Sequence, residues 1–285
     1  MKKYYISFII LCCIFCNSNA ITLDKVRFHN EQNDTSAITQ LLINTYQQHF
    51  DSPNERIGFI ARQFLGLPYV AHTLEGDTEL LTVNINELDC TTFVETVIAM
   101  AYTVGEGRTS WRDYIHNLER IRYRDGILNG YSSRLHYISD WIVNNSYRGN
   151  FSEVTDEFPF VSYKIKTLDF MTSHRKSYNS LTDDAEFEKM KNIEIGYHNH
   201  RFPYLKTSSI KNKAVRNELK DGDIIALTTN TNGLDVSHMG LIAIVDGVPH
   251  LMHASMKAMK VIIDPLPLHK YLANSKSLTG IRVIR

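Results

Sequence analysis

Apolar positions in the first part of the chain recur at the spacing of amphipathic helices. They predict a helix ending near Phe50, a second beginning at the capping box Ser52-Pro53-Asn54-Glu55, and a third over 90–104. The third helix has an almost continuous apolar face, which predicts that it is mostly buried. A strand is expected at 79–85, just before that helix.

The segment from residue 221 to the C-terminus changes to a strand-and-turn pattern. Strands are expected at 224–228, 239–245, 250–253, 261–263 and 281–284. Turns are expected at Asn232-Gly233, Asp246-Gly247 and Asp264-Pro265. Helices followed by a mostly antiparallel sheet predict an α+β fold.

The segment between these two patterns, about 108–215, is predicted to be a large helical and loop insertion. A capping residue, Ser110, predicts one helix, and a second is expected over 134–145. The loops around them are rich in arginine and aromatic residues. Because the chain contains neither an internal repeat nor a Pro/Gly/Ser-rich linker, residues 21–285 are expected to form a single domain.

Residues 1–20 have the pattern of a secretory signal peptide. Lys2 and Lys3 precede an apolar run of about 11 residues, shorter than the roughly 20 needed to cross a bilayer. Ser18-Asn19-Ala20 then fits a cleavage site. We therefore expect export to the bacterial periplasm or cell envelope, without stable membrane insertion. The chain has 31 basic and 31 acidic residues, so loss of the two lysines leaves a formal charge of −2 and nucleic acid is not an expected partner.

Cleavage of the predicted signal would also leave a single cysteine, Cys90, which then has no intramolecular disulfide partner. Asp89 is a suitable N-cap, so Cys90 is expected at the first position of its helix. The partial positive charge at a helix N-terminus lowers a thiol pKa and favours a thiolate nucleophile. The alternative is a small buried residue without chemical function.

A cysteine nucleophile requires a base from elsewhere in the chain. His238 begins an apolar strand, at a distance along the sequence close to the cysteine-to-histidine interval of papain-like enzymes. His253 lies one predicted hairpin later. Adjacent antiparallel strands would bring the two rings together, so that His253 could orient His238. Taken singly, each histidine would more often be a hydrogen-bonded residue of the core or of a sheet edge.

Two other chemistries are weaker alternatives. The chain has 12 histidines, including His198 and His200, but neither an HExxH helix nor a CxxC pair, so no metal or other cofactor is expected. A G-x-S-x-G elbow, which would indicate a serine hydrolase, is also missing from the sequence.

Four motifs, in this order along the chain, resemble the NlpC-type papain-like peptidoglycan hydrolases: Asp89-Cys90, 221–225, 237–240 and 253–255. Further stretches resemble, more narrowly, the secreted N-acetylmuramoyl-L-alanine amidase-like branch: 88–95, 121–126, 131–141, 170–174 and 233–238. The resemblance covers residues 50–285. It implies a papain-like fold, in which N-terminal helices and the nucleophile at a helix N-terminus pack on the C-terminal sheet.

The resemblance also implies a Cys-His-His enzyme that cleaves the amide between N-acetylmuramic acid and L-alanine in peptidoglycan or muropeptides. Carried over to this chain, Cys90 is the nucleophile, His238 the base and His253 the orienting group. Thr91 and Thr92 follow the cysteine where many members have Ser or Gly, and they narrow the space beside the thiol. Residues expected to contact substrate are Tyr69 (as an oxyanion donor), Asp89, Arg122, Arg124, Tyr131, Arg134, His136, Asp235 and Ser237.

Two alternatives stay open at this point. The same three residues could cut within the stem peptide, for instance at a D-glutamyl bond. The chain could instead be a non-catalytic module that binds cell wall through its arginine-rich and aromatic surface.

Overall fold

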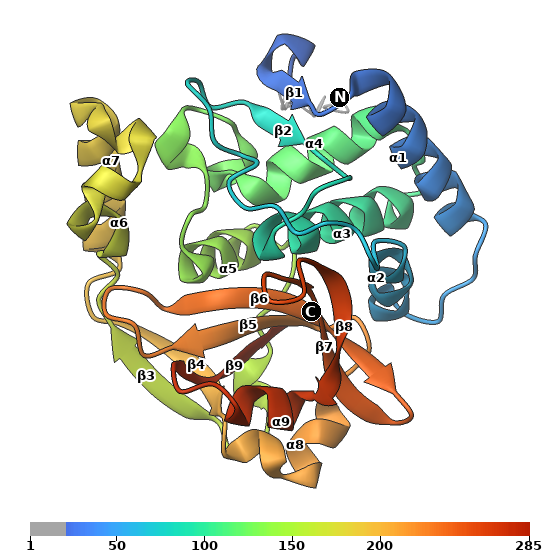
Figure 1. Cartoon of the computed structure of the whole chain (residues 1–285), viewed down its shortest axis with the longest axis vertical. Helices are drawn as coiled ribbons and strands as arrows, with labels where there is room; N and C mark the ends of the chain where they lie inside the picture. The colour runs from blue at the N-terminus through green and yellow to red at the C-terminus, as the bar shows by residue number, and fades with distance from the viewer. Residues whose placement is uncertain (1–20) are drawn as a thin grey trace, which may run out of the picture.

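A computed structural model of the chain describes residues 21–285, so the predicted signal segment 1–20 and its cysteines lie outside the described part. A layer of helices covers one face of a large sheet, and two short helices cover the opposite face (Figure 1). Within residues 21–285, no helix has both the length and the apolar character that crossing a membrane requires. The helices are α1 (Glu31–Tyr46), α2 (Pro53–Arg62), α3 (Cys90–Gly105), α4 (Trp111–Arg122), α5 (Ile138–Tyr147), α6 (Phe170–Ser173), α7 (Asp184–Gly196), α8 (Lys213–Glu218) and α9 (Leu268–Ala273).

The main sheet has the strand order β3-β4-β9-β5-β6-β7-β8, and every neighbouring pair is antiparallel. A separate pair, β1 with β2, is parallel. The mixed α+β class is therefore confirmed. The strands are β1 (Val26–Phe28), β2 (Leu81–Val83), β3 (Ser162–Lys166), β4 (His200–Lys206), β5 (Ile224–Thr229), β6 (Val236–Val245), β7 (Val248–Ser255), β8 (Lys260–Pro267) and β9 (Leu278–Ile284).

The central strand β5 is buried on both faces, because helices cover each side of the sheet. Ile224 and Ala226 belong to the core cluster under the helical layer, whereas Ile225 and Leu227 belong to the cluster that includes residues of α8 and α9. This alternation follows from the two-residue repeat of a strand. It also explains why the strand is a continuous apolar run in the sequence.

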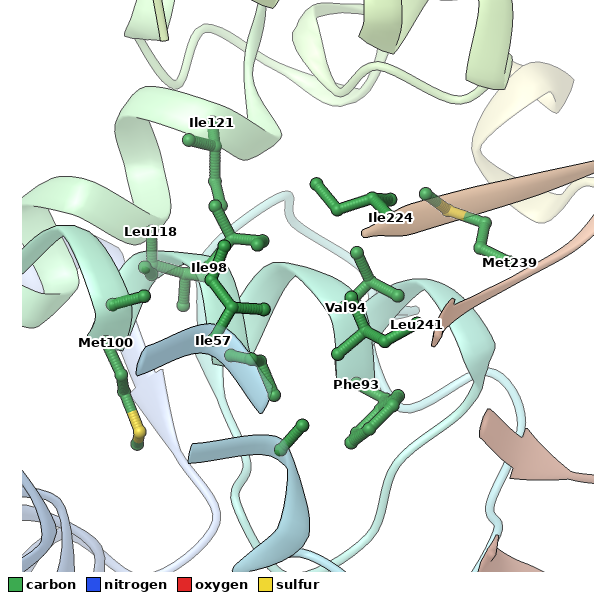
Figure 2. Close-up of a cluster of buried hydrophobic side chains, with 14 of the residues drawn as sticks. Ile57, Phe93, Val94, Ile98, Met100, Leu118, Ile121, Ile224, Met239 and Leu241 are labelled. Carbon is green, nitrogen blue, oxygen red and sulfur yellow. The ribbon is translucent and has the colours of Figure 1, made fainter. Parts of the chain in front are cut away.

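Helix α3 packs directly on this sheet and begins at the expected residue. The Asp89 side chain accepts a hydrogen bond from the Thr92 N–H at 2.8 Å, and the Thr92 hydroxyl accepts one from the Asp89 N–H at 2.9 Å, which completes a capping box. Figure 2 shows Phe93 and Val94 beside Leu241 of β6. Full burial of an aliphatic or phenyl side chain stabilises a fold by about 1.5–3 kcal/mol. The apolar face of α3 therefore fixes where Cys90 meets the sheet.

The segment predicted as a helical and loop insertion contributes two strands to the sheet, β3 and β4. The prediction missed them because neither contains an apolar run. In β3, half-exposed polar residues alternate with the exposed Tyr163 and Ile165, and β4 includes Pro203. The helix predicted at 134–145 begins later, at Ile138. The turn predicted at Asp264-Pro265 is also wrong, since both residues lie within β8.

Gly222 lies in the turn between α8 and β5 and packs against the start of α2, so the fold is expected to tolerate no side chain there. Its φ is +82°, and an added Cβ would lie 2.1 Å from the Asn54 carbonyl oxygen. We expect Gly222→Ala to lower the free energy of unfolding, measured in urea, by about 3 kcal/mol. The matched control is Gly247→Ala, because φ is +75° there and nothing lies within 4 Å of the added carbon. That change should cost about 1 kcal/mol, and equal losses in the two variants would contradict the expected clash.

Candidate active site

Cys90 lies at the N-terminus of α3, half-buried against the start of β6. The Met239 backbone N–H, next to His238 in β6, lowers the pKa of the thiol, which places the sulfur beside this strand. The Thr91 hydroxyl oxygen lies 3.9 Å from the sulfur. Among the residues described, Cys90 is the free cysteine that the sequence singled out.

The pKa of Cys90 is raised, whereas its place at a helix N-terminus was expected to lower it. Burial, together with the nearby Asp89 carboxylate, raises the pKa of the thiol to about 11. The Met239 N–H and Thr91 act in the opposite direction but do not outweigh these effects. The helix start was expected to favour a thiolate, whereas the residue that caps it brings a negative charge beside the sulfur. In the resting protein the thiol is therefore protonated.

His238 and His253 are brought together by neighbouring strands, as the sequence predicted. The Nε2 atom of His238 lies 2.6 Å from Nδ1 of His253, and the two rings are nearly perpendicular. Gly240 makes this approach possible, because a Cβ at that position would lie 2.7 Å from the Met252 carbonyl oxygen and 3.0 Å from the Cβ of His253. The contact occupies Nε2 of His238, so Nδ1 is the nitrogen left to accept a proton.

Burial lowers the pKa of both imidazoles. It lowers the pKa of His238 to about 4, and burial together with the neighbouring His238 lowers the pKa of His253 to about 3. Both rings are therefore neutral near pH 7. Combined with a protonated Cys90, this makes the resting site a neutral thiol and imidazole and not a thiolate–imidazolium ion pair.

The neutral state predicts a distinctive pH dependence for alkylation of Cys90. Only the thiolate reacts, so with a pKa of about 11 the rate with iodoacetamide should rise about tenfold per pH unit from pH 7 to 10. Mass spectrometry of the labelled peptide measures this rate, with Cys90→Ala as the blank and glutathione as the free-thiol reference. A rate that stays level between pH 5 and 8 would instead indicate an ion pair.

Two cavities lie near the catalytic candidates, one lined by the two histidines and the other by the sequence neighbours of Cys90. One, of about 340 Å³, is lined by His238 and His253 with residues of β8 and α9, Asp264 and Tyr271 among them. The other, of about 140 Å³, lies on the side of Asp89 and Thr91. A larger cavity of about 600 Å³ is lined by neither Cys90 nor the two histidines.

Arg134 and His136, both expected to contact substrate, line the small cavity with Asp89. The Arg134 side chain is 7 % exposed and donates to Glu75 at 2.8 Å. Burial lowers the pKa of His136 well below its usual range, and its Nε2 lies 2.9 Å from the Tyr131 carbonyl oxygen. The small cavity thus places a buried guanidinium and a neutral imidazole beside Asp89 and Thr91, the two sequence neighbours of Cys90.

Arg122 and Arg124 both form ion pairs within the fold. The Arg122 side chain is 2 % exposed and donates to Glu95 at 2.6 Å and to the Thr82 carbonyl oxygen at 2.7 Å. Arg124 pairs with Asp140, in the first turn of α5. Both guanidinium groups are held by carboxylates of the fold, and their expected contact with substrate stays a prediction.

Asp235 and Tyr131 line neither of the two cavities near the catalytic candidates. Asp235 is fully buried and accepts the Ser139 N–H at 2.5 Å, in the first turn of α5. It holds that helix start, and its expected contact with substrate stays a prediction. Tyr131 is 5 % exposed and lines the cavity of about 600 Å³.

Tyr69 and Ser237 remain close to the catalytic candidates. Burial, with the neighbouring Cys90 and Asp89, raises the pKa of Tyr69, so its hydroxyl stays protonated and can donate. Ser237 is exposed and precedes His238 in β6. Each therefore still fits a role in contacting substrate.

Asp264 is a residue that the sequence prediction missed. Its Oδ2 atom lies 3.8 Å from Nε2 of His253. The sequence placed it in a turn, and a turn residue has no predictable partner. The only available signal was an acidic residue within a strand-forming segment close to His253.

Comparison with known proteins identifies the relatives of this chain. The model of the AmiA-like family, described as N-acetylmuramoyl-L-alanine amidase-like, matches residues 59–281. No curated protein matches significantly. Among solved structures, an N-acetylmuramoyl-L-alanine amidase from Bacteroides uniformis is 40% identical, with a TM-score of 0.77 over 82% of this chain and 98% of that one.

Two further structures resemble the chain. A Bacteroides fragilis protein described as a "putative xylanase" is 44% identical, with a TM-score of 0.74 over 79% of this chain and 98% of that one. A Legionella pneumophila protein of the DUF1460 family model is 21% identical, with a TM-score of 0.68 over 89% of this chain and 94% of that one, and it supports the fold alone. The match of the family model over most of the chain shows that this protein belongs to the AmiA-like, N-acetylmuramoyl-L-alanine amidase-like family.

Proposed function

We propose that this protein is a cysteine amidase that hydrolyses the bond between N-acetylmuramic acid and L-alanine in peptidoglycan fragments. Family membership supports the amidase class. The observation that carries the cysteine mechanism is the histidine pair, with 2.6 Å between Nε2 of His238 and Nδ1 of His253, beside the strand start that Cys90 faces. A helix N-terminus packed on an antiparallel sheet also supports the NlpC-type, papain-like arrangement.

Attack begins from the neutral thiol. Within residues 21–285, no hydrogen bond joins the sulfur to an imidazole, and the sulfur is near Thr91. Rotation of the Cys90 side chain, a picosecond-to-nanosecond motion for free rotamers, would turn the S–H toward Nδ1 of His238. As the sulfur bonds to the muramoyl carbonyl carbon, the thiol proton passes to Nδ1, and the carbonyl oxygen becomes an oxyanion.

The oxyanion needs donors at the start of α3. The Cys90 backbone N–H is among the first helical amides, which have no partner within the helix. The protonated Tyr69 hydroxyl near the sulfur is the second proposed donor. Collapse of the intermediate breaks the C–N bond, and the His238 imidazolium gives its proton to the departing L-alanine amine.

Release of the acyl group completes the cycle. Water attacks the thioester carbon and gives a proton to the now neutral His238. The C–S bond breaks, the free muramoyl carboxylic acid leaves, and the proton returns to the sulfur. The neutral His238 that both half-reactions need is the form that burial favours, since its pKa is lowered.

The two cavities near the catalytic candidates would receive the two sides of the scissile bond. Arg134 and His136 in the small cavity can donate or accept hydrogen bonds with sugar or carboxylate oxygens. The cavity of about 340 Å³ beside the histidines leaves room for the other side. We also propose that the protein acts in the periplasm or cell envelope, which the signal pattern of residues 1–20 supports.

The decisive test is mass spectrometry of the products formed from a defined N-acetylmuramoyl tripeptide. The proposal expects free N-acetylmuramic acid and a tripeptide with an L-alanine N-terminus, and neither product with Cys90→Ala. A shortened stem still attached to the sugar would show an endopeptidase instead. Intact substrate that is bound but never cut would favour a non-catalytic cell-wall module.

A further inference from the structure

Asp264 lies in β8, on the strand next to His253, at an irregularity in the ladder. Met252 of β7 pairs with Ile263, yet His250, only two residues away, pairs with Pro267. Extra residues of β8 are therefore accommodated around Asp264. Such bulges change the direction of a side chain and are common next to active sites.

The contacts of Asp264 hold its carboxylate toward His253. One oxygen, Oδ1, accepts the Leu266 N–H at 2.9 Å, and the other, Oδ2, lies 3.8 Å from Nε2 of His253. The His253 side chain is 3 % exposed, and its Nε2 atom has no hydrogen-bond partner among residues 21–285. At 3.8 Å the contact is electrostatic, and a shift of roughly 1 Å would close it to a hydrogen bond.

We propose that Asp264 is a positioning residue that selects the tautomer of His253 and, through it, the tautomer of His238. The inference rests on the proposed function, because it explains how His238 is kept ready to act as a base. It extends the three-residue arrangement expected from the sequence to a fourth side chain.

The protons of the two rings are set by their contacts, beginning at the carboxylate. A carboxylate favours the tautomer of His253 with its proton on Nε2, facing the negative charge. Nδ1 of His253 is then an acceptor, so the proton in its 2.6 Å contact must belong to Nε2 of His238. A neutral His238 that is protonated on Nε2 has a free lone pair on Nδ1. That nitrogen can then accept the thiol proton.

Without the carboxylate, the opposite arrangement becomes available. His253 would carry its proton on Nδ1 and donate it to Nε2 of His238, which would place the His238 proton on Nδ1. The base would then point a proton toward the sulfur and could not accept another. In the Ser-His-Asp enzymes, a carboxylate fixes the histidine tautomer in the same way. Here it would act through one additional ring.

Other titratable groups around Asp264 do not supply the same charge. Lys257 and Tyr271 line the same cavity, and burial followed by Asp264 raises the pKa of Tyr271, which stays neutral. His250 contacts the Asp264 carbonyl oxygen through Nδ1 and not the carboxylate. The remaining partner of His253 is His238, the ring that it orients.

The Leu266 N–H makes Asp264→Asn an informative variant. That donor requires an oxygen, so the amide oxygen of the asparagine would take the Oδ1 position and its NH₂ would replace Oδ2. The NH₂ group would then donate to Nε2 of His253 and favour the wrong tautomer. Asparagine should therefore impair the enzyme more than alanine does, although it is closer in shape to aspartate.

The experiment compares Asp264→Asn, Asp264→Ala and a matched control, Asp246→Asn, at an exposed turn of the same sheet. We expect kcat for muramoyl-peptide cleavage to fall about 100-fold for Asn and about 10-fold for Ala, with KM changed less than about twofold and melting temperatures near wild type. Asp246→Asn should leave kcat unchanged. An Asn variant as active as wild type, or no less active than Ala, would overturn the inference.

Nitrogen-15 NMR of the histidine rings tests the tautomers without any substrate. Wild-type His253 should be protonated on Nε2, and Asp264→Asn should move that proton to Nδ1. A wild-type His253 protonated on Nδ1 would reject the inference even if the enzyme is an amidase. Conversely, the expected tautomers in a protein with no amidase activity would leave the inference standing and reject the proposed function.

Discussion

Replacement of His238 by alanine is expected to lower kcat/KM for muramoyl-peptide hydrolysis by about 10³–10⁴-fold, about 4–5.5 kcal/mol in transition-state stabilisation. The reason is that the resting thiol is protonated, with a pKa of about 11, and so cannot attack without a base. His238 is neutral at pH 7 and supplies that base. Single-turnover and steady-state kinetics on a defined muropeptide measure the loss.

A double variant makes the prediction specific. If Cys90 and His238 act as one unit, Cys90→Ser combined with His238→Ala should be about as inactive as either single variant, since such losses are not additive. His49→Ala is the matched control, because the His49 side chain is 91 % exposed. Losses that multiply in the double variant would show that the two residues act independently, and a fully active His238→Ala would exclude the mechanism.

The fold could be predicted where local patterns and packing agree. Helix α3 was predicted with its cap and first residue, because Asp89 and the apolar face of the helix indicate the same start. Strands β5 and β6 were predicted from their continuous apolar runs, which reflect burial on both faces, and β9 from the apolar residues on either side of Arg282. Strands β3 and β4 were missed, because their pairing with each other and with β9 depends on tertiary contacts and not on composition.

The site could be predicted as far as strand pairing determines it. His238 and His253 lie on consecutive antiparallel strands, from which the sequence predicted that the two rings meet, and they do. The arginines show the limit of such inference, because a sequence does not distinguish a guanidinium that binds ligand from one that pairs inside the fold. Arg134 lines the small cavity near Asp89 and Thr91, whereas Arg122 is fully buried in an ion pair with Glu95.

The direction of the Cys90 pKa could not be predicted either, since it depends on the balance between burial and the field of the helix. The same Asp89 that permits the helix start to be recognised raises the pKa of the thiol. A motif therefore locates the nucleophile but does not give its protonation state. That state requires the burial and the neighbouring charges of the folded protein.

Loss of Arg122 is expected to destabilise the protein more than any surface substitution. Arg122→Met should lower the free energy of unfolding in urea at pH 7 by about 3–5 kcal/mol, because it leaves the Glu95 carboxylate buried without its partner. Both side chains are 2 % exposed and are joined at 2.6 Å. Burial already raises the pKa of Glu95, and the arginine opposes that shift. Without Arg122, the carboxyl group should take up a proton on folding.

The double variant Arg122→Met with Glu95→Leu separates the cost of an unpaired charge from the cost of lost packing. Apolar residues of similar volume can replace a buried ion pair with little loss of stability, so we expect the double variant to recover most of the lost free energy. The stability of Arg122→Met alone should also improve as the pH falls, because protonation removes the buried charge of Glu95. If the double variant were as unstable as the single one, the guanidinium would be needed for its hydrogen bond to the Thr82 carbonyl oxygen and not for the charge of Glu95.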